Sequence, residues 1–158
     1  MRPFVLAAFT GLLLTLSFPS VGHPLFAWIS LVPLLAALCA VNSRTAFWLG
    51  LLAGVIHFAG TIYWIPSVMV NFGGLPVFMA WCVHLLFVLF LGSFIAVFAV
   101  SINRLVKRFG QRGLMFAPAV WVAMELGRIH LFTGFPWLLL GYSQVPFLAI
   151  AQVASIVG

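Results

Sequence analysis

The amino-acid sequence predicts an all-α protein, a polytopic bundle of transmembrane helices. Of the 158 residues, 65% are hydrophobic and only 5% are charged, whereas a soluble domain has about 25% charged residues. Long apolar runs recur along the chain, separated by short stretches rich in proline, glycine or basic residues. Seven basic residues and one acidic residue cannot cover a soluble surface. We therefore expect five complete spans and a truncated sixth.

The first three spans are expected at about residues 3–18, 24–41 and 45–65. Pro3 suits the first turn of a helix. Pro33 falls inside the second span and should kink it, which membrane helices tolerate. The third span carries small residues four apart, which let another helix approach closely and predict a packing face. These small residues are Ala46, Gly50 and Gly54.

The remaining spans are expected at about residues 77–102, 114–131 and 145–158, with a non-helical link at 66–76 and a polar loop at 103–113. The last span would be roughly 21 Å long at about 1.5 Å per residue, which is shorter than the ~30 Å hydrocarbon core. We expect the chain to be an N-terminal fragment, with the sequence stopping inside a helix.

The basic residues predict the orientation of the bundle. Alternating spans place six of them on one side and only Arg128 toward the other, and such an excess marks the cytoplasmic side. The N-terminus is therefore expected in the cytoplasm, and residues 66–76 and 132–144 outside. Because the charges are scattered at the ends of segments, without a basic face, we expect no binding of nucleic acid. The six are Arg2, Arg44, Arg104, Lys107, Arg108 and Arg112.

Residues 118–144 combine charge, aromatic rings and helix breakers. Glu125 is the only acidic residue of the chain, and Arg128 lies three positions later, on the same face of a helix. We expect the two to pair, either as a purely structural ion pair or as a device that orients a lipid headgroup. A Gly-Phe-Pro-Trp turn follows at 134–137, and irregular backbone at membrane depth persists only against protein or a water-lined cavity.

Four short motifs resemble the membrane domain of the bacterial apolipoprotein N-acyltransferases. Glu125-x-x-Arg128 is followed by Thr-Gly-Phe-Pro-Trp at 133–137 and by Gly-Tyr-Ser-Gln at 141–144. Upstream, Trp64 precedes Phe-Gly-Gly-Leu-Pro at 72–76. The resemblance covers essentially the whole chain and implies a multi-pass protein of the bacterial inner membrane.

The resemblance also implies a function. This family transfers an acyl chain from a phospholipid donor to the N-terminal amino group of an apolipoprotein acceptor that carries a diacylglyceryl-cysteine. Its cysteine, glutamate and lysine belong to a nitrilase-like domain, expected here after residue 158, so we assign no catalytic residue, cofactor or metal and expect the fragment alone to be inactive. The candidates for facing substrate or lipid are Glu125, Arg128, Trp64, Phe72, Gly73, Gly74, Gly134, Phe135, Pro136, Trp137, Tyr142 and Gln144.

Other interpretations of the polar residues stay open. His57 and His84 lie deep in their spans and favour hydrogen bonds between helices, because a metal site would need further ligands. With Glu125 and Arg128 they could instead line the path of a small transporter or channel subunit, although we find no internal repeat to support one. A third alternative is a scaffold that packs against other helices through its glycine face. Interfacial aromatic residues such as Tyr142 are also explained by the aromatic belt of membrane proteins.

Overall fold

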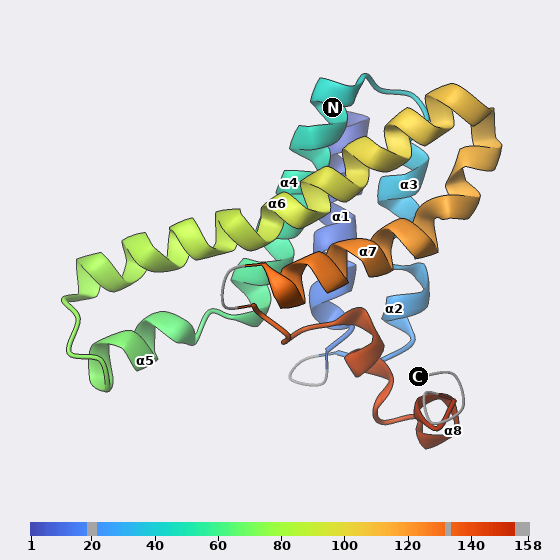
Figure 1. Cartoon of the computed structure of the whole chain (residues 1–158). Helices are drawn as coiled ribbons and strands as arrows, with labels where there is room; N and C mark the ends of the chain where they lie inside the picture. Colours follow the sequence, from blue (N-terminus) through green and yellow to red (C-terminus); the bar gives the residue numbers. More distant parts are fainter. Residues whose placement is uncertain (19–21, 132–133, 154–158) are drawn as a thin grey trace.

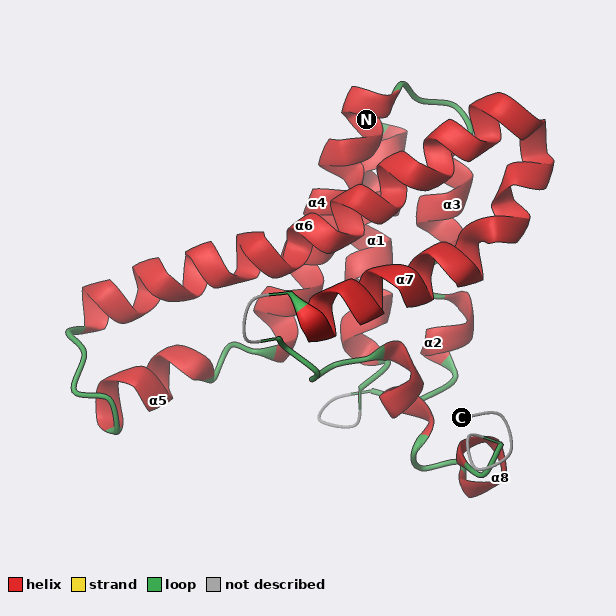
Figure 2. Ribbon diagram, in the orientation of Figure 1, coloured by secondary structure: helices red, strands yellow, loops and turns green. Residues whose placement is uncertain are grey.

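The protein is a bundle of helices joined by short turns (Figures 1 and 2). The computed structural model describes residues 1–18, 22–131 and 134–153, and within these ranges every regular element is helical, which confirms the all-α class. The elements are α1 (Arg2–Leu16), α2 (Phe26–Ile29), α3 (Val32–Leu38), α4 (Ser43–Thr61), α5 (Ile65–Asn71), α6 (Val77–Phe109), the 3₁₀ helix η1 (Gly110–Phe116), α7 (Ala117–His130), the 3₁₀ helix η2 (Leu140–Gln144) and α8 (Leu148–Ala151).

Helix α4 lies at the centre of the bundle, between α1 and α6. Its glycine face contacts α6 so closely that a Cβ atom on Gly50 would lie 2.6 Å from the carbonyl oxygen of Ile95. A Cβ atom on Gly54 would lie 2.6 Å from Cα of Gly92. The predicted packing face is confirmed. Since its partner is a helix of the same chain, this face is not available to a second protein.

The second predicted span is broken. Instead of one helix kinked at Pro33, the chain forms α2 and α3, and Pro33 lies in the first turn of α3, where its missing N–H costs nothing. A backbone N–H in a first helical turn has no partner within its own helix. The N–H of Leu34 is satisfied by α1, because it donates to Oγ1 of the buried Thr10 at 2.9 Å.

The connection from α4 to α6 also differs from the prediction. Only residues 72–76 of the predicted non-helical link at 66–76 lack helix, because α5 begins at Ile65, accommodates Pro66 in its first turn and continues to Asn71. Helix α6 continues beyond residue 102 to Phe109, so most of the predicted polar loop is helix. Lysine and arginine are good helix formers and favour the C-terminal end of a helix dipole. The chain turns only at Gly110, where φ is +63°.

The predicted sixth span is not a continuous helix in the described part of the chain. Residues 140–144 form η2 and only Leu148–Ala151 form α8, with Pro146 between them. Proline has no N–H to continue a helix from η2. Residues 154–158 of this predicted span lie outside the described residues.

One helical stretch in the described residues is long and apolar enough to cross a membrane. It comprises α6, η1 and α7, from Val77 to His130, and its most apolar window has a mean hydropathy of 2.8. Helices α4 and α5 meet the same criterion together but bend by 50° at their junction. Helix α1 and the stretch Phe26–Leu38 are shorter. Five complete spans therefore remain a prediction.

The helices run alternately up and down, which gives the bundle two distinct ends. The N-terminus, the start of α4 and the end of α6 lie at one end, and the C-terminal end of α1 lies at the other with η2 (Figure 1). Helix α5 and the first half of α6 project away from the bundle.

Candidate functional site

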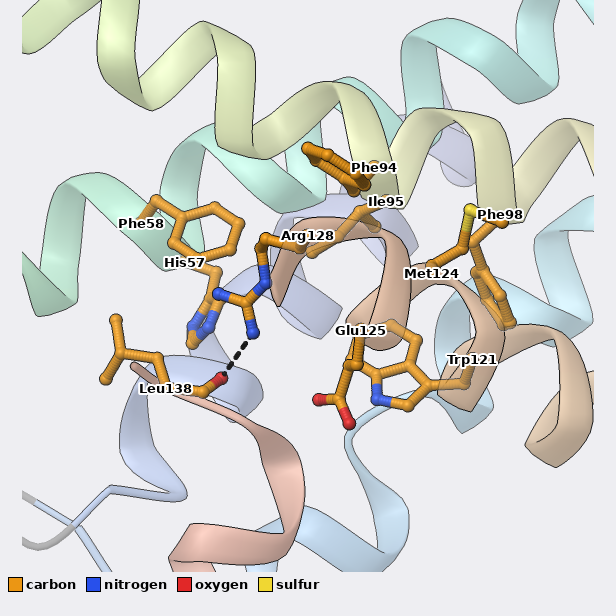
Figure 3. A pocket seen from close by; sticks show the side chains of 10 residues that line it. All are labelled: His57, Phe58, Phe94, Ile95, Phe98, Trp121, Met124, Glu125, Arg128 and Leu138. Atoms are coloured by element: carbon orange, nitrogen blue, oxygen red, sulfur yellow. Dashed lines mark hydrogen bonds between the residues drawn. The ribbon is translucent and has the colours of Figure 1, made fainter. Parts of the chain in front are cut away.

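Helix α7 carries three functional candidates on one face. Trp121, Glu125 and Arg128 are spaced four and three residues apart, so their side chains project from the same side of the helix (Figure 3). Pro118 lies in the first turn of this helix, a position proline favours. The helix ends at His130, and the described residues between it and η2, which are Leu131 and residues 134–139, are irregular. The three side chains therefore face the segment that follows α7. We call its described residues, 134–139, the returning segment.

Arg128 holds that returning segment. Its side chain is only 4% exposed, and its guanidinium donates from Nη1 to the carbonyl of Trp137 at 2.9 Å and from Nη2 to that of Leu138 at 3.1 Å. Leu138 has a φ of +59°, which is uncommon and strained for a side chain of its size. The guanidinium also lies 5.3 Å from the ring centre of Phe58, within the range of a cation–π interaction.

Glu125 binds the same segment a few residues later. Its Oε1 accepts a hydrogen bond from the backbone N–H of Leu140 at 2.7 Å. Among the described side chains, no salt bridge joins Glu125 to Arg128, so the direct ion pair expected from their spacing is not formed. The physical reason is that each charged group binds the backbone instead. The Arg128 guanidinium donates to the carbonyls of Trp137 and Leu138, and the Glu125 carboxylate accepts from the N–H of Leu140.

Two spaces lie on either side of Glu125. The smaller space has a volume of about 20 Å³ and lies between α7 and the helices α4 and α6. Its lining includes His57, Phe58, Arg128 and Leu138 (Figure 3). The indole N–H of Trp121 is buried there without a hydrogen bond of good geometry, although it interacts with the Glu125 carboxylate.

The larger space is an open groove of about 580 Å³ between α2–α3 and α7. This volume falls within the roughly 300–1,000 Å³ of ligand pockets. The walls of the groove are mostly apolar. The polar side chains of Glu125 and Gln144 lie at one end of the groove, next to Leu140 and Gly141 of η2. The full lining is Ala27, Trp28, Leu31, Val32, Leu35, Leu114, Ala117, Pro118, Trp121, Val122, Glu125, Leu140, Gly141 and Gln144.

Gln144 closes this polar end. Its Nε2 donates to the carbonyl of Pro24 at 3.0 Å and its Oε1 accepts from Nε1 of Trp28 at 3.1 Å. The predicted lipid-facing glutamine thus joins η2 to the start of the second span. Trp28 was not singled out by sequence reasoning, because only the fold reveals its partner 116 residues away.

The Gly-Phe-Pro-Trp turn is irregular, as predicted, and glycine is required at its start. Gly134 has a φ of +75°, and a Cβ atom there would collide with the carbonyl of Ile129. Phe135 packs edge-on against Phe87 of α6 with ring centres 5.2 Å apart. Pro136, Trp137 and Tyr142 are exposed, and Thr133 of the same motif lies outside the described residues.

The upstream motif reaches this site through Trp64 alone. The rings of Trp64 and Trp137 lie 6.0 Å apart at an angle of 31°. Phe72, Gly73 and Gly74 lie instead at the tip of the projecting α5–α6 hairpin, where Phe72 is 87% exposed. The structure therefore brings together Trp64, Glu125, Arg128 and residues 134–144 but separates Phe72–Gly74 from them.

His57 and His84 are both buried, and their Nδ1 atoms have no hydrogen-bond partner. The expected hydrogen bonds between helices are therefore not formed through Nδ1. His57 lies between aromatic rings instead, 4.7 Å from Phe58 and 5.7 Å from Phe18. Within the described residues, no group of three or more histidine, cysteine or acidic side chains could hold a metal ion.

Comparison with known proteins identifies the chain. Residues 10–158 match the model of the family described as apolipoprotein N-acyltransferase N-terminal domain. The chain belongs to this family. It is 41% identical over 99% of its length to the apolipoprotein N-acyltransferase of Geobacter metallireducens, and 31% identical over 98% to that of Pasteurella multocida. It is 38% identical over 89% to that of Coxiella burnetii. The chain spans 30%, 29% and 30% of these three relatives, respectively.

Membership of the apolipoprotein N-acyltransferase family confirms the resemblance carried by the short motifs. The match extends over the groove, Glu125, Arg128 and the Gly-Phe-Pro-Trp turn, since all of these lie between residues 10 and 158. The relatives are named apolipoprotein N-acyltransferases.

Proposed function

We propose that this chain is the membrane part of an enzyme that transfers an acyl chain from phospholipid to the N-terminal amino group of a diacylglyceryl-cysteine lipoprotein. Phospholipid is the donor, the apolipoprotein is the acceptor, and the bacterial inner membrane holds the bundle with its N-terminus in the cytoplasm. Family membership and the names of the relatives support this assignment. The apolar composition supports the location.

The role proposed for this part is to anchor the enzyme and to guide an acyl chain. The observation that carries the proposal is the apolar groove beside α7, whose polar end lies at Glu125 and Gln144. An acyl chain is apolar along its length and polar only at its ester. The acyl chain matches the groove if its apolar length lies along α7 and its ester lies at the polar end, near Glu125 and beside the Gly-Phe-Pro-Trp turn.

We propose that the acyl transfer itself takes place outside this chain. Covalent transfer needs a nucleophile that is activated by a base or by a lowered pKa. The thiol of Cys39 donates to the carbonyl of Leu35 in its own helix, at 3.4 Å, and so has no base as its partner in that contact. We propose that a nitrilase-like domain after residue 158 supplies the catalytic residues and that the chain alone does not turn over substrate.

A groove-filling substitution tests this role in the full-length enzyme. Val122→Trp should lower kcat/KM for a long-chain phospholipid at least tenfold, because the indole occupies space needed by the acyl chain. Leu126→Trp is the matched control, since Leu126 lies on the same helix outside the groove lining and is 51% exposed against 52% for Val122. Acylation of a diacylglyceryl peptide is measured at equal membrane abundance.

Parental activity in Val122→Trp would refute the guiding role. The same assay with residues 1–158 alone should give no acylated peptide. Turnover there that is abolished by replacing Cys39 or Cys82 would show that the catalytic chemistry had been placed in the wrong domain.

A further inference from the structure

Besides Arg2 at the N-terminus, five basic side chains lie at one end of the bundle, on α4, α6 and η1. Lys107 and Arg108 lie three and four residues after Arg104 near the end of α6, so each is a neighbour of Arg104 on the helix surface, and all three are exposed. Arg112 follows in η1, and Arg44 lies in the first turn of α4, both exposed. In the sequence these charges flank separate segments, but the fold brings the segments together.

A buried asparagine fixes the start of α4 beside the end of α6. Asn103 is 1% exposed, and its Nδ2 donates to the carbonyls of Leu38 at 2.8 Å and Val41 at 3.0 Å. Its Oδ1 accepts from Ser43 Oγ at 2.9 Å, and Lys107 Nζ donates to the same hydroxyl at 3.4 Å. These bonds hold Arg44, next to Ser43, near Lys107.

No acidic side chain of this chain neutralises the cluster. Glu125 is the only acid in the sequence, and it binds the N–H of Leu140 near the opposite end of the bundle. Clustered like charges repel one another, and a bound anion would relieve this repulsion. The cluster is therefore complementary to an anionic partner.

Exposed apolar side chains adjoin the cations. Phe109, Met115 and Phe116 are exposed, and the guanidinium of Arg108 lies 5.4 Å from the ring centre of Phe109. Gly113 packs so tightly that a Cβ atom would lie 2.6 Å from the carbonyl oxygen of Leu105, which keeps η1 against α6. Cations combined with aromatic side chains are typical of the boundary between headgroups and acyl chains.

We propose that this basic end, formed by Arg44, Arg104, Lys107, Arg108 and Arg112, binds the headgroup phosphates of anionic phospholipids in the leaflet that it faces. The phosphates pair with the cations, and Phe109, Met115 and Phe116 lie at the boundary between the headgroups and the acyl chains. A soluble phosphate or a nucleic acid would pair with the cations but would leave the methionine and much of the aromatic surface in water. This site lies at the opposite end of α7 from Glu125 and is independent of acyl transfer.

Lipid retention tests the proposal. The full-length protein is reconstituted in nanodiscs with equal amounts of phosphatidylglycerol and phosphatidylcholine, and the lipids that remain bound are counted by native mass spectrometry. The parent should retain phosphatidylglycerol in excess. Replacing Arg104, Lys107 and Arg108 together by glutamine should lower this preference, by about fivefold for each cation if each contributes as a polybasic residue does. These side chains are exposed, so the thermal unfolding temperature should change little.

A variant that keeps the positive charges is the control. The double variant Arg104→Lys with Arg108→Lys should keep the preference of the parent. An unchanged preference in the triple glutamine variant would overturn the proposal, as would equal retention of the two lipids by the parent. Complete displacement of phosphatidylglycerol by millimolar inorganic phosphate or by a single-stranded oligonucleotide would assign the cluster to a soluble ligand instead.

Discussion

At the scale of single residues, the guanidinium of Arg128 donates to two consecutive carbonyls, those of Trp137 and Leu138. A hydrogen bond to a charged group contributes about 1.5–3 kcal/mol. Arg128→Ala should therefore destabilise the full-length protein by about 3 kcal/mol or more. Arg128→Lys should be milder, because an ammonium keeps the charge but lacks the planar two-pronged geometry. Thermal unfolding in detergent measures both variants.

Glu125→Gln serves as the companion substitution, since glutamine retains an oxygen that can accept from Leu140 N–H. We expect it to be less destabilising than Arg128→Ala, while both variants reach the membrane and lose lipoprotein acylation. Normal stability and acylation in Arg128→Ala would mean that the bonds to residues 137 and 138 are dispensable. If the variant is inactive only because it is degraded, the role of Arg128 is structural alone.

At the scale of elements, the contact between α4 and α6 depends on glycine. A side chain on Gly54 would enter space held by the backbone of Gly92, and overpacking of this kind costs about 1–3 kcal/mol. Gly54→Leu should therefore lower the unfolding temperature. Gly127→Ala is the control, because its Cβ would lie 3.7 Å from Phe94, an ordinary contact. Equal stability of the two variants would show that the interface is loose.

The helices of this bundle could be located from apolar runs, but several of their boundaries could not. Helix α6 continues through Arg104, Lys107 and Arg108 because charged residues can remain helical outside hydrocarbon, whereas the prediction equated the end of the apolar run with the end of the helix. The sequence predicts a helix kink at Pro33 and a non-helical link at Pro66. Both occupy first turns instead, where proline interrupts no hydrogen bond.

The site could be predicted in part. Glu125 and Arg128 stood out because charged groups are rare in an apolar chain, yet their partners are backbone atoms that no sequence pattern reveals. The groove wall formed by Trp28 and Leu31 was missed for a related reason. In the sequence these residues belong to an ordinary apolar span. Only the fold shows that α2 and α3 lie opposite α7.

At the scale of the whole molecule, the two ends of the bundle should lie on opposite sides of the membrane. The test uses the full-length protein in which the exposed Cys39 and Cys82 and every cysteine after residue 158 are replaced by serine. A cysteine replacing Tyr142, which is exposed after α7, should react with an impermeant thiol reagent in intact cells. One replacing Gln111, exposed in η1, should react only after permeabilisation. The reverse labelling would invert the proposed orientation.

The most direct test of the central claim locates an acyl chain in the full-length protein. A phospholipid with a photoactivatable diazirine in the middle of one acyl chain is incorporated into the membrane, illuminated, and mapped by mass spectrometry of peptides. If the groove guides the donor, the label should concentrate on Trp28, Val32 and Val122, and Val122→Trp should deplete it. Labelling confined to the projecting α5–α6 hairpin, with none in the groove, would contradict the account.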